Sequence, residues 1–293
     1  MSRTEPPYRG RFAPSPTGPL HMGSLIAAVA SYLDARRRGG TWLVRMEDID
    51  PPREQAGAAE AILHSLHCHG LEWDGEVLFQ GTRAAAYDEA LEQLDAAGLL
   101  FRCQCTRQQL GPDGSCGGRC ANPEQSISGP FALRVRVSPG TAITFEDRVQ
   151  GRQEWQLGNT HPDFTVRRKD ELYAYQLAVA VDDAAQGITH VVRGSDLLDS
   201  TPRQLYLMQC LGATPPQYGH FPVITDASGH KLSKQNHAPA LDDNAIDDNL
   251  RRALAFLRQP TPPDSVRGSA SLLGFATEHW ALERIPQRLS LLA

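Results

Sequence analysis

The sequence predicts an α/β fold organised around a parallel β-sheet, and three observations support this. Over the first hundred residues, short strand-like runs alternate with segments in which apolar residues recur at helical spacing. A glycine- and cysteine-rich stretch of different composition follows, and after about residue 240 the chain again has helical spacing. Strands that alternate with helices form parallel sheets, because each helix carries the chain back across the sheet to the next strand.

In the first hundred residues, we expect a short strand at 8–12, which breaks at a proline- and glycine-rich turn. Apolar residues recur three and four positions apart over 21–38, and two glycines follow, so a helix is predicted there. A second strand is predicted at 41–46. Two more helices are predicted at 56–69 and 84–97.

The rest of the chain continues the mixture of strands and helices. The predicted elements are β-like runs at 131–137 and 141–149, core segments at 164–166 and 173–181, a strand at 190–193, and helices at 202–211, 246–257 and 269–282. The last two helices are separated by a proline-rich segment, which favours a break between them.

The composition is that of a globular protein. Hydrophobic residues make up 41% of the 293 residues and charged residues 22%. No apolar run approaches the roughly 20 residues that span a bilayer, and the N-terminus has no signal-peptide core. We therefore expect a cytoplasmic protein without a membrane partner. The net charge of −5 does not suit a general polyanion binder, so contact with nucleic acid would need a local basic face. Residues 36–38, 167–169 and 251–252 offer such clusters, or are solvated surface.

Four of the six cysteines lie close together. Cys103, Cys105, Cys116 and Cys120 have the order C-x-C, ten intervening residues, and C-x3-C. Thiolates at such separations can surround Zn²⁺ tetrahedrally, and four protein ligands leave no open position for catalysis. The interpretation is therefore a structural zinc site, with reduced thiols that bind no metal as the alternative.

A second chemical feature is a short loop that holds two of only three lysines in the chain. Lys231 and Lys234 lie in the sequence His-Lys-Leu-Ser-Lys-Gln. Two ammonium groups on one loop could neutralise the charge that develops on a reacting phosphate. The alternative is a solvated basic loop.

A third feature is the segment from Arg11 to Ser24, where a strand runs through a rigid turn into a helix. The N-terminus of that helix suits a phosphate, and His21 can donate hydrogen bonds to phosphate oxygens. Gly23 removes a side chain where a nucleotide could approach. Taken alone, such a turn is most often only a connection.

A fourth set of residues could hold a dicarboxylic amino acid. Glu47 follows a predicted strand and could accept an α-ammonium group, whereas Arg11 and Arg193 could pair with carboxylates. Tyr175 could add a hydroxyl. Each residue alone could equally be a solvated polar group at a strand end.

Several of these segments resemble the signatures of glutamyl-tRNA synthetases. Residues 11–23 resemble the first signature, the HIGH region, with Ser24 in place of the final histidine. Residues 231–235 resemble the KMSKS loop, with leucine for methionine and glutamine for the final serine. Further similar segments are 45–50, 70–74, 175–183 and 192–203, so the resemblance spans roughly residues 9–240.

This resemblance implies a Rossmann-type parallel-sheet catalytic domain with an inserted zinc-containing α+β subdomain and a C-terminal helical region. The implied boundaries are 1–100 and 166–240 for the two halves of the catalytic domain, 101–165 for the inserted subdomain, and 241–293 for the helical region.

The resemblance also assigns roles to residues. It implies glutamate binding by Arg11, Ala13, Ser15, Glu47, Tyr175 and Arg193. It implies ATP binding by His21, Gly23, Ser24 and Lys234, with Mg²⁺ on the phosphates and with His21, Lys231 and Lys234 as catalytic residues. Which arginine takes which carboxylate stays open.

Only 58 residues follow Gln235, which is too few for the helical anticodon-binding region of a glutamyl-tRNA synthetase. The closer resemblance is to the short glutamyl-queuosine tRNA(Asp) synthetase family, in which Cys116 stands where tyrosine is common. That family activates glutamate without tRNA and transfers it to queuosine in the anticodon loop of tRNA(Asp). The expected partners are glutamate, ATP and queuosine-bearing tRNA(Asp), and a monomer is expected. The alternatives are a truncated glutamyl-tRNA synthetase that charges the 3′ end, and a non-catalytic binding protein.

Overall fold

A computed structural model describes residues 6–121, 127–225 and 239–292. The helices are α1 (Met22–Arg37), α2 (Ala58–Cys68), α3 (Ala84–Ala96), α4 (Leu157–Thr160), α5 (Tyr175–Ala185), α6 (Thr201–Cys210), α7 (Ile246–Phe256) and α8 (Ser269–His279). The strands are β1 (Arg9–Phe12), β2 (Thr41–Met46), β3 (Leu78–Phe79), β4 (Leu100–Cys103), β5 (Ala132–Arg136), β6 (Ile143–Asp147), β7 (Gly151–Trp155), β8 (Asp163–Arg167), β9 (His190–Gly194), β10 (Gln217–Phe221), β11 (Val223–Thr225) and β12 (Ser290–Leu292).

The central strands are parallel, as the alternation of strands and helices predicts. β2 pairs with β1 on one side and β3 on the other, and β9 pairs in parallel with β10. The start of β9 lies beside the start of β1, where the Thr189 amide donates to the Arg9 carbonyl at 2.9 Å. The strands therefore follow the order β3-β2-β1-β9-β10, and the chain changes direction across the sheet between β1 and β9. The carboxyl ends of strands at such a switch point are where α/β proteins bind ligands.

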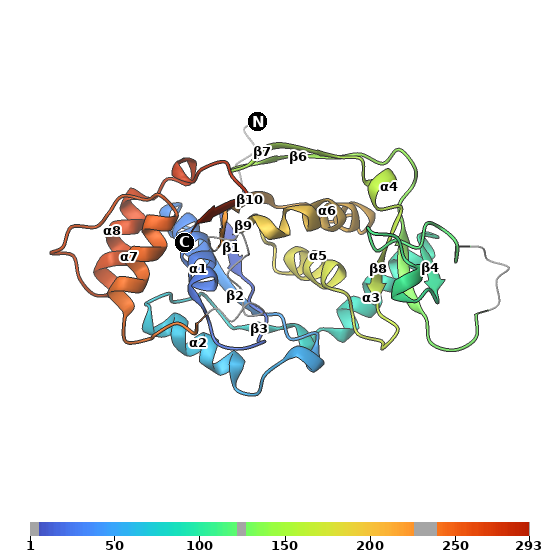
Figure 1. The fold of residues 1–293 in the computed structure, drawn as a ribbon, viewed down its shortest axis with the longest axis horizontal. Coiled ribbons are helices and arrows are strands. Elements are labelled where there is room, and N and C mark those ends of the chain that lie inside the picture. The colour runs from blue at the N-terminus through green and yellow to red at the C-terminus, as the bar shows by residue number, and fades with distance from the viewer. Residues whose placement is uncertain (1–5, 122–126, 226–238, 293) are drawn as a thin grey trace.

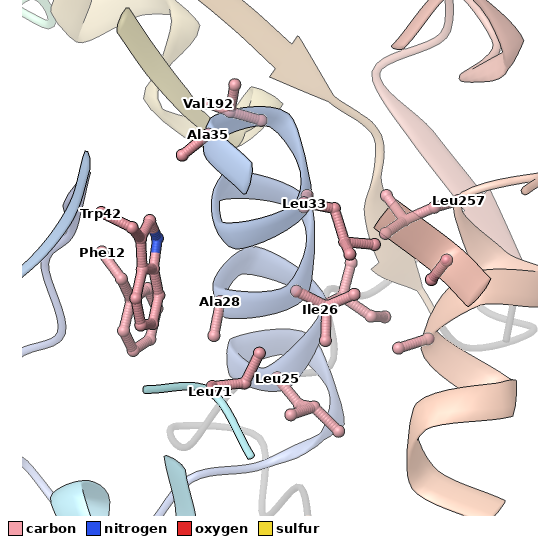
Figure 2. Packing of buried hydrophobic residues seen from close by; sticks show 14 of the residues in the cluster. Phe12, Leu25, Ile26, Ala28, Leu33, Ala35, Trp42, Leu71, Val192 and Leu257 are labelled. Atoms are coloured by element: carbon pink, nitrogen blue, oxygen red, sulfur yellow. The ribbon is translucent and has the colours of Figure 1, made fainter. Parts of the chain in front are cut away.

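Helix α1 lies at the centre of the larger hydrophobic core. Phe12 and Trp42 stack on the sheet side of α1, with ring centroids 6.4 Å apart, whereas Leu257 packs on the opposite side (Figure 2). Since both faces of this helix are covered, residues such as Leu25 and Ile26 are fully buried. This two-sided burial explains why the segment is apolar almost all round.

The cysteine-rich stretch belongs to a separate antiparallel sheet of β4, β5 and β8. Figure 1 shows β4 and β8 at the end of the molecule opposite α7 and α8. The hairpin of β6 and β7 follows β5 and reaches back to the central sheet, where Asp147 pairs with Tyr218 of β10.

The C-terminal part packs on the side of α1 that faces away from Phe12 and Trp42. Helices α7 and α8 pack against α1, and the last strand, β12, pairs in parallel with β11. The segment predicted as one helix over 269–282 ends at His279 and continues as a 3-10 turn at Leu282–Arg284. Across the described ranges, no helix has the length and apolar character needed to cross a membrane.

Candidate active site

A cavity of about 990 Å³ opens at the carboxyl ends of β1, β2 and β9. The residues predicted to bind glutamate and ATP that lie on described parts of the chain all line it: Arg11, Ala13, Ser15, His21, Gly23, Ser24, Glu47, Tyr175 and Arg193. Lys231 and Lys234 lie outside the described residues. Segments far apart in the sequence thus meet at one opening because the strands that carry them end on the same edge of the sheet.

Glu47 is a buried acidic residue that lines the cavity at the end of β2. Its amide donates to the Pro14 carbonyl at 2.9 Å, which ties the end of β2 to the turn after β1. The residue is only 8% exposed. Burial raises the pKa of this carboxyl to about 7, against the opposing charges of Arg45 and Arg11. A cation that enters the cavity would favour the ionised form.

Arg11 shares its carboxylate partner with a second arginine. Arg11 Nε lies 3.1 Å from Asp183 Oδ1, and Arg45 Nη2 lies 2.7 Å from the same oxygen. All three side chains are buried. Burial opposes ionisation of Asp183, but the two guanidinium charges outweigh it and lower its pKa to about 2. Asp183 therefore offsets part of the positive charge on the Arg11 side of the cavity.

Arg193 is held in a different way. Its Nε donates to His220 Nε2 at 3.0 Å, and its Nη2 donates to Thr201 Oγ1 and Gln204 Oε1 at 2.9 Å each. These acceptors are neutral side chains. Among the described residues, no carboxylate lies within ion-pair distance of Arg193, and its buried Nη1 has no hydrogen-bond partner. Arg193 thus lacks the direct carboxylate partner that Arg11 has in Asp183, although its charge opposes the rise in the pKa of Glu47.

The N-terminus of α1 lines one part of the cavity through His21, Gly23 and Ser24. His21 caps this helix, because the Ser24 amide donates to His21 Nδ1 at 3.3 Å. The Ser24 hydroxyl lies 3.1 Å from Nε2 of the same ring. A β-carbon at Gly23 would lie only 3.0 Å from the His21 ring, so glycine also lets the imidazole fold back over the helix end. No acidic residue occupies the first turn, which leaves the positive end of the helix dipole available.

The four clustered cysteines meet in space, as their spacing predicts. Their sulfur atoms all lie within 4.8 Å of one another, and the Cys105 and Cys120 sulfurs are 3.5 Å apart. Four sulfurs at about 2.3 Å from a tetrahedral zinc lie roughly 3.8 Å apart, so this geometry fits such an ion. Cys103 and Cys105 also line the cavity. The cluster could therefore hold a metal next to the space that a substrate enters.

A buried ion pair braces the second pair of cysteines. Asp163 Oδ1 accepts from the Cys116 amide at 2.9 Å and from Arg134 Nε at 2.5 Å. Arg134 Nη2 also donates to the Gly114 carbonyl at 2.6 Å. Through this ion pair, β5 and β8 hold the backbone of the turn-rich segment at Gly114 and Cys116.

Sequence reasoning missed several residues that shape the site: Arg45, Arg134, Asp147, Asp163, Asp183, Thr201, Gln204 and His220. Asp182 and Asp183 follow an apolar helical run, but the local sequence does not show that either carboxylate is buried or which arginine it contacts. The basic clusters proved partly structural. Arg36 pairs with Asp74 at 2.7 Å, and Arg251 donates to the Pro262 carbonyl at 2.6 Å.

Comparison with known proteins gives the class of this fold and site. The family model described as tRNA synthetases class I (E and Q), catalytic domain, matches residues 8–114 and 119–259. The chain belongs to this family of class I tRNA synthetases. Within it, the chain groups with proteins named Glutamyl-Q tRNA(Asp) synthetase. The relative from Neisseria meningitidis serogroup C is 51% identical over 290 residues, which cover 96% of this chain and 98% of the relative. That from Thiobacillus denitrificans is 52% identical and covers 94% of each chain.

Solved structures support the fold. A glutamate tRNA ligase from Elizabethkingia meningosepticum, in complex with its amino acid, matches with a TM-score of 0.81 at 22% identity. The match covers 96% of this chain and 66% of that one. A glutamate-tRNA synthetase from Elizabethkingia anophelis gives a TM-score of 0.83 at 22% identity, over 98% of this chain and 68% of that one.

Proposed function

We propose that this protein uses ATP to activate glutamate and transfers the glutamyl group to queuosine in tRNA(Asp). The observation that carries the first step is that one cavity is lined by a buried carboxyl, Glu47, and by the Arg193 guanidinium, whose Nη1 has no hydrogen-bond partner among the described residues. An α-amino acid presents one ammonium and at least one carboxylate, and these are the complementary charges. The acceptor rests on the relatives, which are named for glutamyl-queuosine tRNA(Asp) and match along nearly their whole length.

In this proposal, Glu47 binds the α-ammonium of glutamate. Arg11 and Arg193 bind the two carboxylates, with Tyr175 adding a hydroxyl and Ala13 and Ser15 forming the wall. Arg11 is partly neutralised by Asp183 at 3.1 Å, whereas Arg193 keeps its full charge. A dicarboxylic substrate therefore meets two cations with different surroundings.

ATP would bind at the N-terminus of α1, with phosphates facing His21, Gly23 and Ser24. A carboxylate oxygen of glutamate attacks the α-phosphorus, and the bond to pyrophosphate breaks. Lys231 and Lys234, which the sequence places on the KMSKS-like loop, would stabilise the charge of that step. Mg²⁺ bound to the phosphates would neutralise part of it.

For the transfer step, a hydroxyl of the queuosine cyclopentenediol would attack the activated carbonyl, and AMP would leave. This diol resembles the ribose cis-diol that tRNA synthetases acylate. A base in a single-stranded loop can be splayed into a pocket at little cost. The activity would be cytoplasmic, where such tRNA is used.

The cysteine cluster would hold one structural Zn²⁺ through Cys103, Cys105, Cys116 and Cys120. The metal would cross-link a turn-rich segment and take no part in catalysis, because protein thiolates would fill all four of its coordination positions. The ordered segment then forms one wall of the cavity.

Pyrophosphate exchange without tRNA tests the activation step. We expect exchange of labelled pyrophosphate into ATP with glutamate, and much less with glutamine or aspartate. Glu47→Gln should abolish the exchange. Arg152→Ala, whose side chain is 69% exposed and lies on the β7 edge, is the matched control and should retain it. Equal exchange with all three amino acids, or none with any, would contradict the proposal.

A further inference from the structure

Arg193 has an unusual balance of satisfied and unsatisfied donors. Its Nε and Nη2 each have neutral acceptors at 3.0 Å or less, whereas Nη1 is buried and, within the described parts of the chain, has no partner. Buried guanidinium donors without partners are rare in folded proteins and call for an explanation. Because Arg193 lines the cavity, a ligand carboxylate is the natural partner for this free edge.

The tautomer of His220 follows from its neighbours. Asp147 Oδ2 lies 2.5 Å from His220 Nδ1, while Asp147 Oδ1 accepts three backbone amides, from Val149, Gln150 and His220 itself. These amides and the imidazole lower the pKa of Asp147 despite its burial, so it is ionised. An ionised carboxylate only accepts hydrogen bonds, so the proton of His220 is on Nδ1. Nε2 is therefore the acceptor for Arg193.

His220 also stays neutral. Burial and the charge of Arg193 lower the pKa of this imidazole to about 4, against the opposing effect of Asp147. A neutral acceptor orients a guanidinium without cancelling its charge. Arg11 shows the contrast, since the carboxylate of Asp183 both orients and neutralises it.

We propose that His220, fixed by Asp147, is the positioning residue that aims the free Nη1 edge of Arg193 at a carboxylate of the amino-acid substrate. This inference rests on the proposed activation of glutamate. Among the described residues, Arg193 is the cavity-lining residue that hydrogen-bonds to His220, so the effect of His220 on substrate passes through Arg193. ATP, at the N-terminus of α1, does not depend on it.

Two substitutions separate the contact of Nδ1 with Asp147 from the contacts of Nε2 with Arg193 and Thr201. In His220→Asn, the short amide can reach Asp147 in place of Nδ1 but leaves Arg193 Nε without its acceptor. In His220→Gln, the longer amide can place an oxygen near the position of Nε2. The first variant should therefore lose the orientation of Arg193, and the second should recover much of it.

The measurement is the KM for glutamate and the KM for ATP in pyrophosphate exchange, with thermal unfolding of each variant as a check of folding. We expect His220→Asn to raise the KM for glutamate by roughly 10-fold or more, as for loss of a hydrogen bond to a charged group. The KM for ATP should stay within about twofold of the wild-type value, because the proposed ATP site at the N-terminus of α1 does not include Arg193. His220→Gln should recover most of the glutamate KM.

Failure of the positioning role of His220 can be distinguished from failure of the proposed glutamate activation. If wild type shows no glutamate-dependent exchange, the activation proposal fails and this inference falls with it. If wild type is active but folded His220→Asn keeps the wild-type KM for glutamate, only the positioning role is overturned. Equal rises in both KM values, or a His220→Gln variant that folds and yet is as impaired as His220→Asn, would also overturn it.

Discussion

Arg45 and Asp183 form a fully buried ion pair, in which Arg45 Nη2 lies 2.7 Å from Asp183 Oδ1. Arg45 is two residues before Glu47 on the same chain segment, and Asp183 also contacts Arg11. The binding carboxyl and one binding arginine of the proposed site are therefore built on a single buried charge network. Disturbing this network should affect stability and substrate binding together.

Asp183→Asn should strongly destabilise the protein, because it leaves two buried guanidinium groups without their shared charge. Removing one partner of a buried ion pair typically costs about 3–5 kcal/mol. For a chain of this size, that lowers the midpoint of thermal unfolding by on the order of 10 °C. Asp170→Asn is the control, since its pair with Arg168 is largely exposed and should matter little. Similar midpoints for the two variants would be inconsistent with a central role for this network.

Glu47→Gln should stabilise the folded protein at alkaline pH while it removes activity. The folded-state pKa of about 7 lies above the ordinary value of 4.5, so the folded protein holds this proton more tightly than the unfolded chain. Its contribution to stability is present below pH 4.5 and is lost as the pH rises through 7. At pH 8, the midpoint of unfolding of Glu47→Gln should exceed that of wild type by a few degrees. This difference in midpoint should shrink towards pH 5. A difference that instead grows as the pH falls would mean that the folded protein lowers the pKa of Glu47 rather than raising it.

The same titration should appear in catalysis. If ionised Glu47 binds the α-ammonium, kcat/KM for glutamate in pyrophosphate exchange should rise with pH and level off above about 7. The measurement is a profile from pH 5.5 to 8.5 in wild type, with kcat/KM for ATP at saturating glutamate as the reference. A flat glutamate profile across this range would argue against Glu47 as the ammonium ligand.

The metal site predicts a clear contrast among the six cysteines. Wild type should contain one zinc per chain, and Cys103→Ser should lose it together with thermal stability. Cys68→Ser and Cys210→Ser are matched controls, because neither belongs to the four-sulfur cluster. Metal analysis by mass spectrometry and thermal unfolding give the readouts. Zinc retained in Cys103→Ser, or lost equally in all three variants, would speak against this site.

Much of the fold could be predicted from the sequence because local patterns and tertiary packing agree there. The segment at 41–46 is a strand with the predicted limits, and helices α1 and α3 lie within a residue of theirs. The strand β10 was missed, since Gln-Tyr-Gly-His-Phe has little strand pattern of its own. It forms a strand because it pairs with β6 on one side and β9 on the other, and both strands lie earlier in the chain.

In the candidate site too, some residues could be predicted from local sequence, whereas others depend on contacts between distant parts of the chain. Residues at or just after strand ends, such as Arg193 and Glu47, could be predicted because position in an α/β sheet assigns them to the edge that binds ligands. Asp183 and His220 could not, because their importance lies in which arginine each one contacts. Those contacts join residues separated by 172 and 27 positions, and nothing in either local sequence specifies them.

The destination of the glutamate is the central claim, and its most direct test uses tRNA(Asp) from which the 3′-terminal CCA has been removed. Labelled glutamate, ATP and the protein are incubated with this tRNA carrying either queuosine or unmodified guanosine in the anticodon, and the label on RNA is counted. We predict that the label enters only the queuosine-bearing tRNA and does so without the 3′ end. Label that requires an intact 3′ end, or that enters tRNA lacking queuosine, would contradict the account.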